Sequence, residues 1–241
     1  MKRTATILTT AALLFMGACG SDNAKDDTDS KDDDKKSEET IEDLDPEEIL
    51  DLATEYILDA DQVTLSGEMV EDDEEMEVTM SYDGDNSHGL IVTPAGEFEV
   101  LQVDGSSYFR ADDAFWSNEA GAEAQLFVDA LGGRWLDVTD DPDMGDLTQM
   151  TDRQSFVDEV FDAEGEVTVG DTKKVEGVEC LSLSDGESPL WVALDDARPI
   201  ALEAPEDEEG ELVFDYDEAD VPDAPSADEV TTMDELIASF G

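Results

Sequence analysis

Hydrophobic and polar positions follow a helical spacing near residue 50. In DPEEILDLATEYILDAD, residues 45–61, Asp45 stands where it can cap a helix, and Pro46 occupies the first turn, which tolerates its missing N–H. Apolar positions then recur every three or four residues, which predicts one helix of about four turns with a single apolar face. That face consists of Ile49, Leu52, Ala53, Tyr56, Ile57 and Ala60.

The pattern then changes to strict alternation, which is typical of strands with one buried face. Residues 74–85, EEMEVTMSYDGD, place Met76, Val78, Met80 and Tyr82 on one side. Turn residues such as Asp-Gly separate this segment from its neighbours. The pattern predicts an antiparallel meander with one solvated face. The neighbouring segments lie at 63–70, 88–96, 97–105 and 106–111.

Helical segments interrupt the strands and a second group of strands follows. We predict helices at 112–116, 119–133 and 151–161, the last with a capping box between Thr151 and Gln154. The apolar stripe of that last helix consists of Phe156, Val157, Val160 and Phe161. Further strands are predicted at 134–138, 166–177, 178–186, 189–196, 198–204 and 211–219, before a short helix at 232–240. This order predicts an α+β fold class: a curled antiparallel sheet, as an open half-barrel, with helices packed on its concave face.

Acidic residues dominate the composition. The chain has 68 Asp and Glu residues against 12 Lys and Arg residues, a formal net charge of −56, and only six of the basic residues lie in residues 45–241. No basic patch exists to neutralise phosphates, which excludes nucleic acid as a partner, and a bare anionic membrane would repel the chain. Self-repulsion of this size needs screening, which predicts a halophilic source with the domain bathed in brine; an ordinary acidic secreted protein is the alternative.

The first residues resemble a lipoprotein signal. Lys2 and Arg3 precede an apolar stretch at 5–15, and Met16-Gly17-Ala18-Cys19 follows. This arrangement resembles the lipobox of bacterial lipoproteins, with Met16 where Leu is usual. The resemblance implies attachment of diacylglycerol, with acyl chains such as palmitate, to the Cys19 thiol, and then removal of the signal peptide 1–18. An anchor of two or more acyl chains implies a lipid-anchored protein on the extracytoplasmic face of the cell membrane. Ordinary secretion, with Cys19 as a bystander, is the alternative.

Residues 19–44 are polar and rich in charge, with no aromatic residue. Such a stretch cannot bury enough apolar surface to offset its ordering entropy, so we predict a disordered acidic tether. A calcium-binding tract is the alternative, but the stretch lacks the spaced ligands of an EF-hand loop. The tether would hold a folded domain, residues 45–241, away from the membrane.

Enzyme chemistry has little support. His88 is the only histidine, the G-x-S-x-G motif of an α/β-hydrolase nucleophile is absent, and no Cys/His metal cluster occurs. We interpret His88 as an exposed turn residue and Cys180 as a small buried hydrophobe. No catalytic residue, cofactor or metal is therefore predicted.

One acidic stretch resembles a calcium loop in part. In residues 140–152, Asp141, Asp143 and Asp152 stand at the first, third and last positions of an EF-hand pattern. Gly145 stands where a ligand belongs and Asp146 where the glycine belongs. A solvated loop is the interpretation we adopt, with a weak surface calcium site as the alternative.

Several segments together resemble one known family. They are the lipobox, the helix before the first strand, VDGSSYFRADDAFW at 103–116, GRWLDV at 133–138, and the hairpin from KKVEGVECLSLSDG to PLWVALDDARPIALE at 173–203. Over residues 45–240 the chain resembles the LolA/LppX-type lipoprotein family of actinobacteria, including its LprG-like members. The resemblance implies a half-barrel of antiparallel strands with helices on its concave face. It also implies a hydrophobic cavity that holds or carries acylated lipids.

Methionine and aromatic residues on the apolar faces are the candidates for such a cavity, because these side chains adapt to irregular apolar guests. Packing against the helices is the alternative role for each of them. The candidates are Met69, Met76, Met80, Tyr108, Phe115, Trp116, Phe127 and Trp135.

Taken together, these features predict a membrane-anchored lipoprotein that is not an enzyme and that binds or carries a hydrophobic, lipid-like ligand, such as an acylated glycolipid. An envelope sensor or protein-interaction module without a ligand is one alternative. A wall-associated hydrolase is another.

Overall fold

The computed structural model describes residues 40–71, 74–119, 121, 124–141, 144–161, 163, 165–186, 188–205 and 209–239. The predicted signal peptide 1–18, Cys19 and the tether as far as residue 39 lie outside the described residues. Within the stretch predicted as tether, the 3-10 helix η1 (Ile41–Asp43) is formed. Ile41 is buried and its N–H donates to the carbonyl of Leu194, so packing against the domain reaches back at least to this residue.

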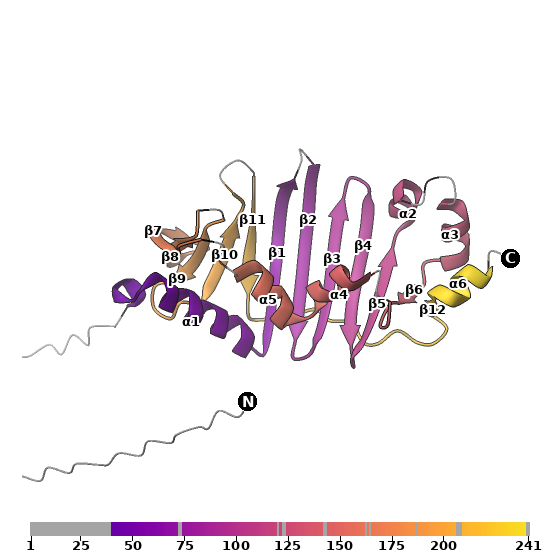
Figure 1. The fold of residues 1–241 in the computed structure, drawn as a ribbon, viewed down its shortest axis with the longest axis horizontal. Helices are drawn as coiled ribbons and strands as arrows, with labels where there is room; N and C mark the ends of the chain where they lie inside the picture. The colour runs from indigo at the N-terminus through magenta and orange to yellow at the C-terminus, as the bar shows by residue number, and fades with distance from the viewer. Residues whose placement is uncertain are drawn as a thin grey trace, which may run out of the picture. The chain divides into compact units, whose positions relative to one another are not determined.

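Twelve strands form one sheet in the order β12-β6-β5-β4-β3-β2-β1-β11-β10-β9-β8-β7 (Figure 1). The strands are β1 (Gln62–Glu71), β2 (Glu74–Asp83), β3 (Asn86–Thr93), β4 (Gly96–Val103), β5 (Ser106–Ala111), β6 (Trp135–Asp137), β7 (Thr168–Val175), β8 (Val178–Ser184), β9 (Leu190–Ala193), β10 (Pro199–Glu203), β11 (Gly210–Asp215) and β12 (Val230–Thr232). Neighbouring strands are antiparallel, except that β12 pairs with β6 in parallel. The sheet is curled and remains open, which confirms the predicted α+β fold class.

Helices cover one face of this sheet, which we call the inner face. In Figure 1, α4 and α5 lie across the middle of the sheet, α1 lies toward the end formed by β7 to β10, and α2 and α3 lie beyond β5. The helices are α1 (Pro46–Asp59), α2 (Asp113–Glu119), α3 (Ala124–Leu131), α4 (Gly145–Thr151), α5 (Arg153–Phe161) and α6 (Met233–Ser239). None of the helices in the described part of the chain has the length and apolar character needed to cross a membrane.

Helix α1 forms where its local signals predict it. Pro46 stands at its first position, and the backbone N–H of Asp45 donates to the Glu48 carboxylate over 3.3 Å. Ile49 and Ile57 are fully buried against the sheet. Leu52, which the spacing placed on the same face, is 40% exposed and does not belong to the main core.

The start of α5 differs from the prediction. The stretch interpreted as a solvated loop contains α4, so Thr151 ends that helix and the predicted capping box with Gln154 does not form. The hydroxyl of Thr151 instead donates to the side chain of Gln102 over 2.9 Å. Asp152 caps α5, since its carboxylate accepts bonds from the N–H (2.8 Å) and hydroxyl (2.7 Å) of Ser155.

The main core lies between the inner face and the helices. Gly89 leaves room for one of its members, since a Cβ there would lie 2.4 Å from Sδ of Met80. Strand residues of this core include Val63, Leu65, Met80, Tyr82, Val100 and Phe109. They pack against Ile49, Ile57 and Val157 of the helices. Every second residue of each strand therefore faces the helices, as the alternation predicted.

The opposite, outer face is polar in the middle and crossed by the segment after β11. The hydroxyl of Thr64 lies 3.0 Å from that of Ser81 and donates to the carbonyl of Glu218. Further along, Val221 packs against a small second core of Leu101, Val103 and Trp135. This segment brings β12 beside β6, which gives the one parallel pair among the described strands.

Candidate functional site

Two hollows open beside α1 and α5, and both are built from residues of these helices and of the sheet. The larger, which we call the polar hollow, has a volume of about 1440 Å³. The smaller, which we call the apolar hollow, has a volume of about 420 Å³. The apolar hollow is lined by Leu50, Asp158, Glu159, Val160, Phe161, Ala163, Val167, Leu183, Ser184, Asp185, Ser188, Leu190 and Leu202.

The apolar hollow has a hydrophobic floor and an acidic rim. Leu183 and Leu190 come from adjacent strands of the inner face and are 2% and 5% exposed, so they form the floor. The end of α5 supplies Phe161 as part of the wall. Asp158 and Glu159, one turn earlier on α5, are exposed and lie at the rim. Eight of the thirteen described lining residues are apolar and five are polar. A volume of this size with apolar side chains and several polar groups is within the range of small-ligand sites.

The polar hollow is lined mainly by charged and polar side chains. Among the described residues that line it, Arg153 is the one cation, and seven carry carboxylates. The carboxylates belong to Glu55, Asp59, Asp61, Asp83, Asp85, Asp152 and Asp196. Three tyrosines, Tyr56, Tyr82 and Tyr216, complete the larger side chains of its wall.

Arg153 acts as a structural clamp at the base of this hollow. Its guanidinium donates to the carbonyls of Ile57 (3.4 Å) and Ala60 at the end of α1, and to the carbonyl of Gly84 (3.1 Å) in the β2–β3 turn. Helix α1 has no basic residue in its last turn, so Arg153 supplies the missing partner for its final carbonyls. Three structural elements, α1, α5 and the β2–β3 turn, therefore meet at the polar hollow. Among the described residues that line it, the one cation donates its hydrogen bonds to backbone carbonyls and not to an anion.

Tyr82 contributes to the same joint. Its hydroxyl donates to the carbonyl of Met150 in α4 over 2.7 Å. Burial raises the pKa of this phenol, so it stays protonated and keeps its donor role. The Arg153 guanidinium lies 5.8 Å from the centre of its ring.

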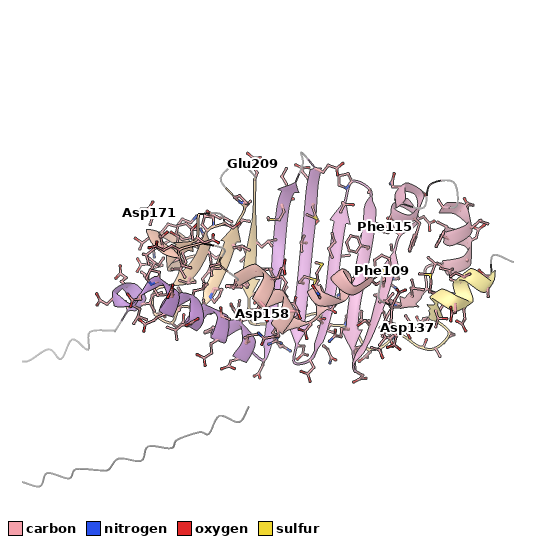
Figure 2. The ribbon with its side chains drawn as sticks, viewed as in Figure 1. Phe109, Phe115, Asp137, Asp158, Asp171 and Glu209 are labelled. Atoms are coloured by element: carbon pink, nitrogen blue, oxygen red, sulfur yellow. The ribbon has the colours of Figure 1, made fainter. Side chains whose placement is uncertain are left out.

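Three of the predicted cavity residues come together at the α2 end of the sheet. Phe115, Trp116 and Phe127 form one aromatic cluster with Phe98 and Phe109, and the rings of Trp116 and Phe127 stack with centroids 5.5 Å apart. Figure 2 shows Phe109 and Phe115 close together at this end, away from Asp158 on α5. These rings contact one another. Packing was the alternative role that we considered for these residues from the sequence.

Gly96 is what allows α2 to approach this cluster. Its φ of 143° and its missing side chain both matter here, because a Cβ would lie 2.2 Å from the backbone N of Phe115. The carboxylate of Asp112 accepts a bond from the same N–H over 2.7 Å and starts the helix.

The remaining candidates are dispersed. Met69 and Met76 pair across β1 and β2, while Met80 is buried in the main core. Tyr108 and Trp135 belong to the small core of the outer face. None of the eight candidates is among the described residues that line the two hollows. The residues that do line the apolar hollow had a signal in the sequence, namely the stripe of α5 and the alternation of β8.

His88 is not the exposed turn residue that the sequence suggested. It lies within β3, its side chain is 16% exposed, and its Nε2 is 3.1 Å from the Glu99 carboxylate. Arg110 donates to the same carboxylate through Nε over 2.8 Å. The hydrogen bond from His88, followed by that from Arg110, lowers the pKa of Glu99. The turn is shorter than expected, so strand pairing extends through His88.

Cys180 is fully buried on β8, as predicted, among Val175, Trp191 and Ala201. Burial raises the pKa of its thiol, which disfavours the reactive thiolate. Across the described ranges, no group of three His, Cys, Asp or Glu side chains has an arrangement that could hold a metal ion.

Neither a protein-family model nor a curated protein sequence matches the chain. Solved structures with a similar course of the chain include LprF from Mycobacterium bovis, at 10% identity over 75% of this chain and 97% of that one, with a TM-score of 0.46. Lipoprotein LppX from Mycobacterium tuberculosis follows at 7% identity, 73% and 98% coverage and a TM-score of 0.46. An uncharacterized conserved protein from Thermus thermophilus has 10% identity, 77% and 98% coverage and a TM-score of 0.43. These values are too low to carry an argument about ligand or activity.

Proposed function

We propose that this chain is a lipid-anchored extracytoplasmic lipoprotein that binds a hydrophobic ligand in the apolar hollow. The observation that carries the proposal is the floor of Leu183 and Leu190 beneath a space of about 420 Å³. Eight of the thirteen described residues that line this space are apolar, and the polar ones include three carboxylates and two serines. An apolar guest would restore the dispersion contacts that the lining lacks.

The membrane location rests on the N-terminal sequence. The lipobox-like Met16-Gly17-Ala18-Cys19 supports acylation of Cys19, and the polar stretch that follows supports a tether to the folded domain. The resemblance of the segments described above supports membership of the LolA/LppX-type family and an actinobacterial origin, and the net charge of −56 supports a saline habitat. A Cys19→Ala variant is expected in the soluble fraction of the native host; retention in the membrane would contradict the anchor.

The binding function is tested by extraction. The protein is purified from its native host under detergent-free conditions as the Cys19→Ala chain, and organic extracts are analysed by mass spectrometry. We expect a stoichiometric apolar compound. The Ala163→Phe variant, which places a ring in the hollow, is expected to lose it. Ala238→Phe adds the same ring to an exposed position on α6 and serves as the matched control.

One observation favours a second candidate function. The five rings around Phe109 pack against each other, so the α2 end of the sheet forms a solid block with the exposed Leu126 beside it. Such a block suits a protein-interaction module that needs no ligand. Extracts without any bound compound, from protein that folds cooperatively, would favour this alternative.

A further inference from the structure

We infer that the apolar hollow takes a single apolar chain whose polar end carries no negative charge, so that anionic lipids and free fatty acids are excluded. This inference rests on the proposed binding function and adds to it the chemical class of the ligand. It follows from the distribution of charge around the hollow, from the depth of its residues and from the use of the nearby cations elsewhere.

The burial of the residues that line the hollow determines how a bound ligand would be oriented. Leu183, Leu190 and Val167 are nearly inaccessible at the bottom, whereas Asp158 and Glu159 are exposed. An apolar chain therefore enters with its tail toward the sheet and leaves its polar end level with α5. Figure 2 labels Asp158 on α5.

Charge at the rim decides which polar end is tolerated. The described lining of the hollow includes three carboxylates, those of Asp158, Glu159 and Asp185, and no Lys, Arg or His. A carboxylate or phosphate held beside them meets like charges at short range in a partly apolar site, where the interaction is stronger than in bulk water. Specificity of this kind comes from repulsion of the wrong ligand. A hydroxyl, an amide, a sugar or an amine meets no such penalty.

The basic residues nearest to α5 are used elsewhere. Among the described residues, Arg153 is committed to the carbonyls of Ile57, Ala60 and Gly84. Lys173 pairs with Glu203 and lies 4.0 Å from the centre of the Trp191 ring on the other side of the sheet. An anionic head at the rim would therefore find no cation of the described chain to accept it.

The test uses two probes with the same chain, dodecan-1-ol and dodecanoate, in competition with the uncharged dye N-phenylnaphthylamine. The protein is the full chain with Cys19→Ala, so that its own acyl chains do not compete. We expect dodecanoate to bind about tenfold more weakly than dodecanol or worse, equivalent to about 1.4 kcal/mol. High sodium chloride should narrow the difference, because salt screens charges at an exposed rim.

Two variants locate the effect. Asp158→Asn with Glu159→Gln is expected to strengthen dodecanoate binding severalfold relative to dodecanol. Glu74→Gln with Glu75→Gln removes two charges from an exposed, adjacent pair on β2, outside the hollow, and should change neither probe. Ala163→Phe should abolish binding of both probes, with its fold checked by circular dichroism.

The outcomes are distinguishable. Equal binding of the two probes, or a response to the β2 pair as large as to the rim pair, would overturn the ligand class and leave the binding function intact. Binding that survives Ala163→Phe would place the probes outside the hollow and would also overturn the inference. Failure of every probe, together with empty extracts from the native host, would overturn the proposed function itself.

Discussion

The two hollows share α1 and α5 as walls, yet they differ in the residues that line them. The larger one is lined by seven carboxylates and Arg153, and Arg153, Tyr82 and Tyr216 donate to backbone carbonyls of the protein itself. The smaller one is lined, among the described residues, by eight apolar ones, Leu183 and Leu190 among them, and by five polar ones. Size alone would favour the polar hollow as a ligand site. The proposed ligand is assigned to the smaller hollow because most of the described residues that line it are apolar.

The difference arises along one short helix. Helix α5 begins with Arg153, which reaches the end of α1, and finishes with Phe161, which lies against the apolar hollow and 6.4 Å from the Phe214 ring. The first turn of α5 therefore connects this helix to α1, and its last turn forms part of the wall of the apolar hollow. Val157 between them is fully buried and fixes the helix to the sheet.

The small number of Lys and Arg residues explains why Arg153 connects structural elements at the polar hollow. The folded part of the chain, residues 45–241, has six Lys and Arg residues, and all are engaged within it. Arg134 donates to the carbonyls of Ala130 and Leu131 at the end of α3, as Arg153 does for α1. The others are Arg110 with Glu99, Lys173 with Glu203, Lys174 with Glu179, and Arg198 beside the Tyr216 ring. In so acidic a protein, five of these six cations stabilise backbone ends or carboxylates that would otherwise repel one another, and Arg198 lies 5.9 Å from the centre of the Tyr216 ring.

The largest expected effect tests the floor of the apolar hollow. Leu183→Ala should lower the free energy of unfolding by about 2–5 kcal/mol, because it removes buried methyl groups and leaves a cavity. Val169→Ala, directly opposite on β7 but 42% exposed, should cost less than about 0.5 kcal/mol. Urea unfolding at fixed salt measures both. Similar losses in the two variants would mean that the floor is not packed as described.

The second-largest expected effect tests whether Arg153 holds α1 and the β2–β3 turn together at the polar hollow. Arg153→Met should lower the free energy of unfolding by about 2 kcal/mol, because hydrogen bonds from a charged donor to the carbonyls of Ala60 and Gly84 are lost. Lys174→Met makes the same change in net charge at an exposed pair 3.8 Å apart and is the control. A loss as large in Lys174→Met would assign the effect to net charge and not to the clamp.

Salt should stabilise the whole domain, and the polar hollow with it. The Debye length falls from about 10 Å to about 3 Å between 0.1 M and 1 M salt, so repulsion among carboxylates weakens. We expect the midpoint of thermal unfolding to rise by more than about 4 °C, about 1 kcal/mol or more for a domain of this size. A midpoint indifferent to salt would contradict the halophilic interpretation.

The smallest expected effect concerns Glu99 on the outer face, which lies outside both hollows and serves as a reference. The lowered pKa of Glu99 means that its stabilisation is present above the ordinary carboxyl value of 4.5 and is lost as pH falls through the lowered value. Glu99→Gln should therefore cost about 1 kcal/mol at neutral pH and nothing in acid. Glu97→Gln, exposed on the same strand, is the control. A pH-independent difference would exclude the ionised carboxylate as the cause.

Local pattern was enough to predict most strands and α1, because alternation and capping act over neighbouring residues. It missed α4 and the short strand β12. In α4 the helical spacing is obscured by acidic residues and a glycine, and β12 is a strand only because β6 lies beside it. His88 was assigned to a turn for a similar reason, since its strand continues through pairing with β2.

The candidate cavity residues show the same division. Large apolar side chains were correctly placed on apolar faces, but Phe115 and Phe127 meet other rings, whereas Phe161 borders a space. Which neighbours a side chain meets depends on how distant strands are ordered in the sheet. That ordering is a property of the packed molecule and has no local pattern.

The sequence by itself determined the α+β class, the acidic character, the helix at the start of the domain and the lipobox-like Cys19, because each depends on residue type and short-range spacing. Only the tertiary structure decided that Arg153 is a clamp, that His88 binds Glu99 and that α5 and β8 enclose an apolar space. Those features arise where segments far apart in the chain meet. Packing geometry and burial, rather than residue identity, set their chemistry.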